Sequence, residues 1–267
     1  MKYTVRPLLT GHFTVDFKGA EPVRFPSVKN IPSFIFLITS EKDEHIIVDT
    51  GFDINHIPGP DSSCTRREGQ DIQSLLRELD IDPLSIKTVI QTHLHWDHAA
   101  GIKFFPNAKI YVQAGEIEGL FSLKEFEETS FAPYHWFDAL ERFALVNGDL
   151  EIKPGIKLLQ TGGHTRGHQG VKINCLDNSV VLIGDSPFTY EWLWTLVPPS
   201  LWESYRSGAG QKFFWKDEYL DRIRSWYEKN RPREPLLDLY RTVEDLRQSG
   251  DIALFAHDPT LKGTETF

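Results

Sequence analysis

Cysteine is scarce in this chain: only Cys64 and Cys175 occur among 267 residues. Two thiols form at most one disulfide, so the fold cannot depend on a disulfide framework, and they are too few for the thiolate cage of a structural zinc site. Any metal that the protein binds must therefore be held by imidazole nitrogen and carboxylate oxygen.

Positive charge is also in short supply, with 29 Lys and Arg residues against 38 Asp and Glu residues and a formal net charge of -9. The sequence shows no basic run that would offset this balance. Because an acidic surface opposes binding to a phosphate backbone, we expect no nucleic-acid partner.

Long apolar runs are missing as well. No window is long and apolar enough to cross a membrane, and the first residues, "MKYTVRPLLTGHF", do not resemble a signal peptide. We therefore expect no membrane association and a cytoplasmic location. The composition, 40% hydrophobic and 25% charged, is typical of a soluble globular enzyme. No linker divides the chain, so we predict a single domain over residues 1–267.

Apolar runs separated by turn residues predict both strands and helices. The segment "SFIFLITSEKDEHIIVDTG" predicts a hairpin with its turn near residues 41–44. Helical spacing predicts helices over "GQDIQSLLRELDI", "AGEIEGLFSLKEFEE" and "PLLDLYRTVEDLRQSG". Further strands are predicted over "IKTVIQT", "AKIYVQ", "GIKLLQT", "GVKINCL", "SVVLIGD" and "IALFAHD". This alternation favours a layered α/β architecture with helices on the outside of the sheets.

The strand "IKTVIQT" leads directly into the motif "HLHWDH". Residues two apart on an extended segment point the same way, so His93 and His95 can converge on one ion. Asp97 and His98 are adjacent, so the chain must turn there, and the second pair can face a different point. A helix cap at Asp97 with solvated histidines is the alternative. Against it, three further candidate ligands follow apolar strand-like runs: His164, Asp185 and His257.

These residues resemble the metal-binding motifs of the metallo-β-lactamase superfamily, and the resemblance extends from Ser33 to Asp258. It implies a four-layer αββα sandwich with two metals at one edge between the sheets. It also implies two groups of ligands that share one carboxylate: His93, His95 and His164 for one metal, Asp97, His98 and His257 for the other, with Asp185 between them.

Two further residues match the family pattern less directly. In "TGGHTRGH" the first histidine is the ligand in the family, which leaves His168 to support a ligand or to pack in the core. Asp49 resembles the aspartate that braces the metal-binding loop, and an Asx turn before Gly51 is the alternative.

Imidazole and carboxylate ligands suit zinc, and manganese, cobalt or iron fit the same donors. We therefore predict two zinc ions. Ions roughly 3.5 to 4 Å apart can bridge a water, lower its pKa and polarise the oxygen that accepts charge. The sequence thus predicts a metal-dependent hydrolase of ester bonds, in which a bridging hydroxide attacks the substrate. Asp97 and Asp185 are the candidate catalytic residues, and Asp185 is expected to orient the hydroxide.

Within the superfamily the chain looks most like the lactonase branch, which opens acyl-homoserine lactones and is linked to quorum quenching. This resemblance implies a small-molecule substrate. Trp96 stands where lactonases carry an aromatic pocket wall, although core packing is the alternative. Phe188 stands where they carry a tyrosine that contacts the substrate carbonyl, and Tyr190 is the candidate replacement.

A tryptophan-rich segment, about residues 188–232, also departs from the lactonase pattern. The part from Phe188 to Trp226 contains five of the seven tryptophans. This segment has three interpretations: a lid over an apolar mouth, the surface of a possible homodimer, or an ordinary helical insertion. The stretches "LVPPSLW" and "RSGAGQ" interrupt a long helix and favour the lid.

Five other activities or roles share parts of this pattern. A phosphodiesterase would need basic surface, and a glutathione-thioester hydrolase normally carries basic contacts on a helical extension. The family's di-iron oxygen-reducing modules typically carry glutamate where this chain has His95. A metal-binding scaffold protein is the remaining alternative, and carboxylic-ester hydrolysis other than lactone opening also fits.

Overall fold

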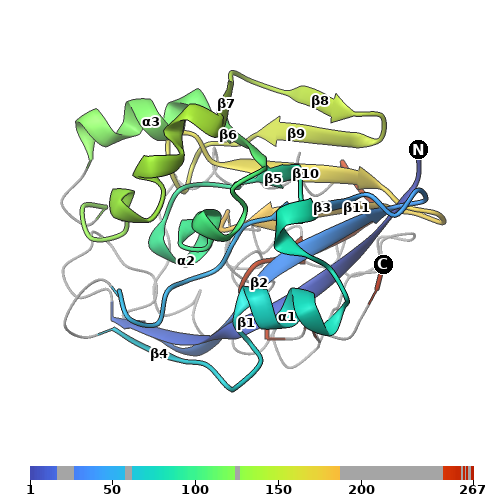
Figure 1. Cartoon of the computed structure of the whole chain (residues 1–267). Coiled ribbons are helices and arrows are strands. Elements are labelled where there is room, and N and C mark those ends of the chain that lie inside the picture. The colour runs from blue at the N-terminus through green and yellow to red at the C-terminus, as the bar shows by residue number, and fades with distance from the viewer. Residues whose placement is uncertain are drawn as a thin grey trace, which may run out of the picture.

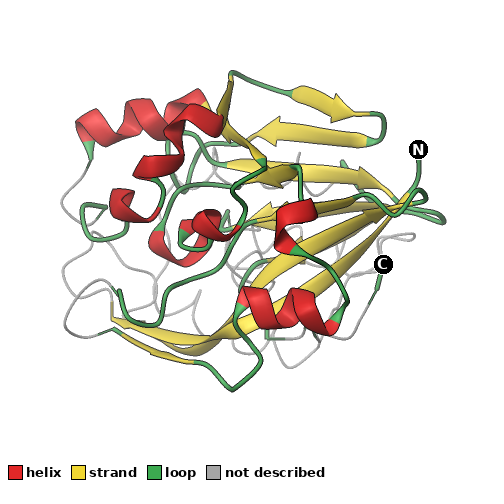
Figure 2. Ribbon diagram, in the orientation of Figure 1, coloured by secondary structure: helices red, strands yellow, loops and turns green. Residues whose placement is uncertain are grey.

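Two β-sheets pack against each other in the computed structural model of the chain (Figures 1 and 2). The structure describes residues 1–16, 27–57, 62–123, 127–186, 249–259, 261, 263 and 266–267. All statements about the fold refer to these residues. None of the helices within them is long and apolar enough to span a membrane.

The first sheet has seven strands and contains the N-terminal half of the described chain. The strands β1 to β4 are joined by antiparallel pairing, whereas β3, β5, β6 and β7 are mutually parallel along the sheet. Their spatial order is β4, β1, β2, β3, β5, β6 and β7, which span Ser63–Thr65, Tyr3–Asp16, Ser27–Ser40, His45–Val48, Thr88–Ile90, Lys109–Gln113 and Phe143–Val146.

The second sheet has five strands. Strands β11 and β12 pair in parallel, and the other neighbouring strands are antiparallel. The order is β12, β11, β10, β9 and β8, which span Ile252–Phe255, Ser179–Gly184, Gln169–Asn174, Ile156–Gln160 and Leu150–Lys153.

The side chains of strand β2 contribute to two separate hydrophobic cores. Alternate side chains of a strand point to opposite faces. Phe34 and Phe36 therefore lie in the core between the two sheets, with residues of β9 to β12. Ile35 and Leu37 point the other way and pack under the helices. A strand buried on both faces needs a nearly continuous apolar sequence, which explains "SFIFLI".

Short helices cover the outer face of the seven-stranded sheet and are drawn in red in Figure 2. Helix α1 begins after Asp71, whose side chain accepts a hydrogen bond of 2.9 Å from the Ser74 N–H. Ile72 and Leu76 anchor it in the core. The α-helices α1, α2 and α3 span Ile72–Glu78, Trp96–Ala99 and Ala114–Gly119, and 3-10 turns span Pro83–Ser85, Ile102–Phe104, Leu120–Ser122, Pro133–His135 and Phe137–Arg142.

Most of the predicted elements are confirmed. The hairpin forms β2 and β3, "GQDIQSLLRELDI" contains α1, and the other six predicted strands are β5, β6, β9, β10, β11 and β12. The α-helix predicted over residues 114–128 ends at Gly119, and it is wrong for Leu120–Ser122, which form a 3-10 turn; residues 124–126 lie outside the described residues. The helix predicted over 235–250 lies almost wholly outside the described residues, as does the tryptophan-rich segment at 188–232.

Candidate metal centre

The candidate ligands lie at one edge of the two sheets, where several strands end. Strand β5 ends at Ile90 and delivers the motif that starts at His93, and α2 begins immediately after His95. In the second sheet, Asp185 directly follows β11 and His257 follows β12, which runs parallel to it. Because parallel strands end at the same edge, these residues approach one another from both sheets.

The first group consists of His93, His95 and His164, whose ring nitrogens lie within 4.8 Å of one another. The Nε2 atom of His164 is 3.0 Å from Nδ1 of His95. His93 and His95 are buried, and the side chain of His164 retains 18% of its exposure. The group therefore has one partly open side.

The second group consists of Asp97, His98, Asp185 and His257, with ligand atoms that also lie within 4.8 Å of one another. The two Nε2 atoms of His98 and His257 are 3.2 Å apart. Asp97 Oδ2 lies 3.5 Å from Nε2 of His257 and 3.7 Å from Nε2 of His98. All four residues are buried.

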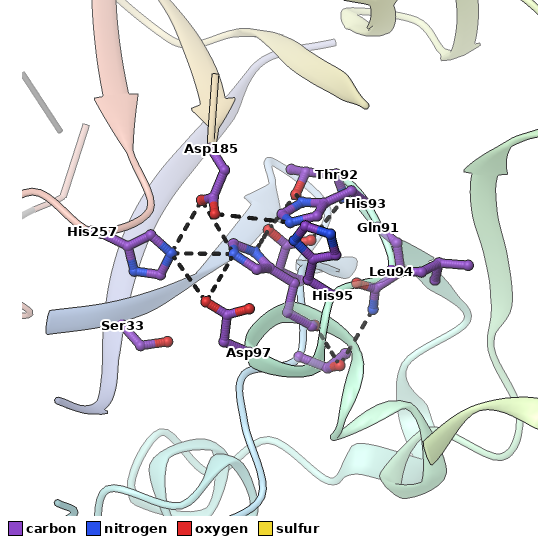
Figure 3. A network of polar contacts seen from close by, with 12 residues as sticks. Ser33, Gln91, Thr92, His93, Leu94, His95, Asp97, Asp185 and His257 are labelled. Carbon is purple, nitrogen blue, oxygen red and sulfur yellow. Dashed lines mark hydrogen bonds and ion pairs between the residues drawn. The ribbon is translucent and has the colours of Figure 1, made fainter. Parts of the chain in front are cut away.

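The Asp185 carboxylate stands between the two groups and faces each with a different oxygen (Figure 3). Its Oδ2 atom is 3.8 Å from His93 Nε2 and 3.6 Å from His164 Nε2. Its Oδ1 atom is 3.2 Å from His98 Nε2 and 3.1 Å from His257 Nε2. One carboxylate can thus serve both groups.

The spacing of these atoms fits bound metal ions. Ligand atoms about 2.0 to 2.1 Å from a tetrahedral zinc lie about 3.3 Å from one another. The separations given above, within and between the groups, run from 3.0 Å for His95 and His164 to 3.8 Å for His93 and Asp185. Within the described chain, His93 Nε2 is buried without a hydrogen-bond partner. Because orphaned buried polar atoms are costly, the donor set fits a metal-binding site.

The protonation state of the first group also suits metal binding, whereas in the second group the neighbouring carboxylates outweigh burial and raise the pKa values of His98 and His257. Burial and the neighbouring imidazoles hold the pKa values of His93 and His95 well below the ordinary value. Burial lowers the pKa of His164 to about 4. Burial opposes ionisation of Asp185 too, but His98 and His257 outweigh it and lower its pKa. Neutral imidazole and ionised carboxylate are the forms that bind metals.

Asp49 contacts the motif from the end of β3. One of its oxygens accepts a hydrogen bond of 2.8 Å from the Thr92 N–H, and the other lies 2.8 Å from Nδ1 of His98. The Thr92 hydroxyl donates to the same carboxylate at 2.8 Å. Asp49 has a φ of 60°, which aspartate tolerates better than most residues. The carboxylate therefore joins the strand end to the ring of a candidate ligand.

His168 contacts the backbone of Asp185. Its Nε2 atom accepts a hydrogen bond of 3.1 Å from the Asp185 N–H, and its Nδ1 lies 2.5 Å from the Thr161 hydroxyl. Burial lowers the pKa of His168 to about 3, so the ring is neutral. Gly184 makes room for it, since a Cβ there would lie 2.6 Å from His168 Nε2.

Trp96 is buried rather than open to solvent. It packs with Phe13 at a centroid distance of 5.4 Å and with Phe52 at 6.1 Å. The Phe13 ring also lies 4.9 Å from the His257 ring. Trp96 is thus part of an apolar cluster directly beside the second group. The other two candidate pocket residues, Phe188 and Tyr190, lie outside the described residues.

Thr92 and Glu116 contact the motif, and the sequence pattern did not single out either of them. Thr92 binds Asp49, and Glu116 accepts a hydrogen bond of 2.8 Å from the Leu94 N–H. Nothing in "AGEIEG" separates the buried Glu116 from the exposed Glu118 except its place on the helix. The available signal in the sequence was the position of Glu116 at the end of the apolar face of the helix.

The family profile of the metallo-beta-lactamase superfamily matches residues 29–212, more than half of the chain. The chain belongs to the metallo-β-lactamase superfamily. The recognition made from the motifs is confirmed, and so is the predicted α/β sandwich fold.

Its relatives within that superfamily include lactonases. N-acyl homoserine lactonase AiiA of Bacillus thuringiensis subsp. kurstaki is 31% identical over 180 residues, which cover 61% of this chain and 66% of that protein, slightly under two thirds. N-acyl homoserine lactonase AttM of Azorhizobium caulinodans is 28% identical over 177 residues, which cover 60% of this chain and 67% of that protein. A solved quorum-quenching N-acyl homoserine lactone hydrolase has a TM-score of 0.63 at 25% identity and covers 97% of this chain and 94% of its own. The predicted enzyme class, a hydrolase of the lactonase or esterase type, is the class of these relatives.

Proposed function

We propose that this protein is a dinuclear metal-dependent hydrolase that opens the ring of acyl-homoserine lactones. The observation that carries the proposal is the position of Asp185, whose two oxygens face two separate groups of imidazoles at 3.1 to 3.8 Å. A carboxylate so placed can be shared by two ions. The lactonase relatives support the substrate class.

Seven side chains would hold the ions: His93, His95 and His164 in one group, Asp97, His98 and His257 in the other, and Asp185 in both. Two zinc ions bound there would supply an activated water at neutral pH and positive charge beside the substrate carbonyl. Manganese, cobalt and iron would fit the same donors.

The protein's own carboxylates orient the reacting groups in this proposal. The backbone of Asp185 is held in place, because His168 accepts a hydrogen bond from its N–H group. The Asp185 side-chain oxygens would therefore be held between the two groups as acceptors for an attacking water, and a fixed acceptor lowers the cost of orientation. Asp97 is the second proposed catalytic residue and faces the same space from α2, beside His98 and His257.

An apolar wall beside the second group suits a substrate with an acyl chain. Trp96 directly precedes Asp97 and packs on Phe13, whose ring lies against His257. We propose that Trp96 forms the inner part of this wall. Phe188 and Tyr190 remain proposed pocket residues, with Tyr190 as the group that contacts the substrate carbonyl.

Several broader predictions also stand as proposals. We propose a single domain over residues 1–267 in which residues 188–232 form a lid over the metal centre or the surface of a homodimer. The small-molecule substrate is proposed from the lactonase relatives, the absence of a nucleic-acid partner from the acidic composition, and the cytoplasmic location from the lack of long apolar runs in the sequence.

Proton release tests the proposed activity. The zinc-loaded protein, mixed with a long-chain acyl-homoserine lactone and a pH indicator, is expected to release acid, whereas chelator-treated protein is not. His93→Ala and Asp185→Asn are the matched variants. Each removes a ligand, so each should lower kcat/KM by at least ~100-fold, the upper end of what loss of a supporting contact costs.

Two outcomes would contradict parts of this proposal. Wild-type turnover in Asp185→Asn would overturn the role given to its carboxylate. No turnover in a wild-type protein that holds two metals would exclude this substrate class, and aryl esters, thioesters and phosphate diesters would be tested next. A wild-type protein that binds no metal would exclude the metal-dependent hydrolase and leave a non-catalytic scaffold role.

A further inference from the structure

Glu116 is a fully buried carboxylate outside the seven candidate ligands. It lies in α3 and accepts three hydrogen bonds. The Leu94 N–H donates to Oε2 at 2.8 Å, while the Gly167 N–H and the Thr165 hydroxyl donate to Oε1 at 2.9 and 2.5 Å. Burial raises the pKa of Glu116 to about 7 against the effect of these bonds. Burying this carboxylate therefore carries a clear cost.

The donors come from the two loops that carry the first metal group. Leu94 stands between His93 and His95, and its side chain points away from the imidazoles (Figure 3). Thr165 directly follows His164. One carboxylate thus ties together the backbone segments of all three histidines. The second group has no such contact with Glu116 among the described residues.

Two glycines allow the loop to reach the helix so closely. A Cβ added to Gly167 would lie 2.2 Å from the backbone nitrogen of Glu116. A Cβ added to Gly115 would lie 3.0 Å from the Cα of Gly167. The absence of side chains at both positions brings the Gly167 N–H within hydrogen-bond distance of the carboxylate. A glycine in the helix and a glycine in the loop therefore both permit the close approach.

We propose that Glu116 is a positioning residue that sets the metal affinity of the three-histidine group by locking the His93–His95 segment to the His164 loop. This inference rests on the proposed function only in requiring that the three histidines bind a metal. Both carboxylate oxygens are needed as acceptors, because donors approach each of them. An amide of the same shape offers one acceptor and turns an N–H group toward donors on its other side.

Zinc affinity of Glu116→Gln provides the direct test. We expect the dissociation constant for zinc at the three-histidine group to rise ~10- to 100-fold, the usual effect of removing a partner that orients metal ligands. The second group should keep its affinity. Competition with a zinc-binding dye of known affinity measures both constants. Thr165→Val removes one donor and should show a smaller loss in the same group.

Glu118→Gln is the matched control. Glu118 lies on the same helix and pairs at 2.9 Å with Arg166 of the same loop, but both side chains are exposed. Exposed ion pairs contribute little, so this variant should bind zinc as the wild type does. Thermal unfolding of the metal-free variants checks that each one folds.

Two ligand variants assign the effect to one group. In a His257→Ala background, which spares the three histidines, Glu116→Gln should still weaken zinc binding. In a His164→Ala background, where the group is already damaged, it should add little. Equal weakening in both backgrounds would show a general structural effect and overturn the inference.

The remaining outcomes separate the inference from the proposed function. Unchanged zinc affinity in folded Glu116→Gln would overturn the role of Glu116 and leave the metal centre intact. Failure of the wild-type protein to bind zinc, manganese, cobalt or iron would instead contradict the proposed function itself.

Discussion

At the scale of the residue, the centre places pairs of imidazole nitrogens unusually close together. His95 Nδ1 lies 3.0 Å from His164 Nε2, and His98 Nε2 lies 3.2 Å from His257 Nε2. Such a pair is favourable only with a proton or a metal between the nitrogens. Burial lowers the pKa values of His95 and His164, so a proton between these two rings is disfavoured and a metal is the better occupant.

His135 gives a pH prediction away from the metal centre. Burial lowers its pKa to about 4 from the ordinary 6.5, with smaller effects from Asp53, Lys103 and His56. Above pH 6.5 the ring is neutral in both the folded and the unfolded protein. As the pH falls from 6.5 toward 4, the unfolded chain takes up the proton first, so the free energy of unfolding decreases.

The measurement is the unfolding free energy of metal-free protein between pH 7 and pH 4. His135→Phe should lose less stability over this window than the wild type, because it has no ring to protonate. The other histidines contribute equally to both proteins and cancel in the comparison. An identical pH dependence of the two would contradict the assignment of a neutral buried ring.

Most of the candidate ligands could be predicted from sequence because their signal is local. The motif from His93 to His98 follows a strand, and Asp185 and His257 each follow one too. Glu116 could not be predicted in this way. Its three donors are separated from it by 22 to 51 positions along the chain, so only the folded structure brings them to the carboxylate.

At the scale of the element, helix α2 depends on the loop after β3. A four-residue helix is too short to be stable alone. The Thr50 N–H donates to the His98 carbonyl at 2.6 Å, the Ala100 N–H donates to the Gly51 carbonyl at 3.0 Å, and the Gly101 N–H donates to the Thr50 hydroxyl at 3.1 Å. These bonds fix the helix that carries Asp97 and His98.

Gly101→Ala should disrupt this contact. A Cβ at Gly101 would lie 2.4 Å from the Thr50 carbonyl oxygen, so the loop must shift. We expect a loss of about 1 to 3 kcal/mol in the free energy of unfolding, as for other overpacked sites. Denaturant titration measures it. Gly119→Ala is the control, since its Cβ would meet nothing closer than 3.5 Å; equal losses in both would contradict the steric argument.

Strands with strong apolar patterns could be predicted, and those without them could not. Strand β8 has the sequence "LEIK", is exposed at its first two residues and lies at the edge of its sheet. Strand β4 covers three residues with little burial. Edge strands of this kind have no buried face to impose alternation. The N-terminal strand β1 was also missed, because Pro7 and Gly11 interrupt its pattern.

At the scale of the whole molecule, the metal centre joins the two sheets. His93 and His95 extend from the seven-stranded sheet, whereas His164 comes from the second sheet, after β9. The second group likewise combines residues of α2 with Asp185 and His257 from the ends of β11 and β12. A bound metal is therefore expected to cross-link the two halves of the core.

Metal removal should lower the stability of the whole fold. A ligand that binds only the folded state adds about 2.7 kcal/mol when its free concentration is 100 times its dissociation constant. The melting temperature should thus rise with free zinc and fall after chelation. Calorimetry over a series of buffered zinc concentrations measures this. A melting temperature independent of zinc would contradict a metal shared between the sheets.

The number of zinc ions bound per chain distinguishes a dinuclear centre from a mononuclear one. Protein saturated with zinc and freed of excess metal by gel filtration is analysed by mass spectrometry for zinc and for protein. Two zinc ions per chain are predicted, because the Asp185 carboxylate faces two groups of ligands. A stoichiometry below two at saturation, in folded wild-type protein, would contradict the dinuclear centre.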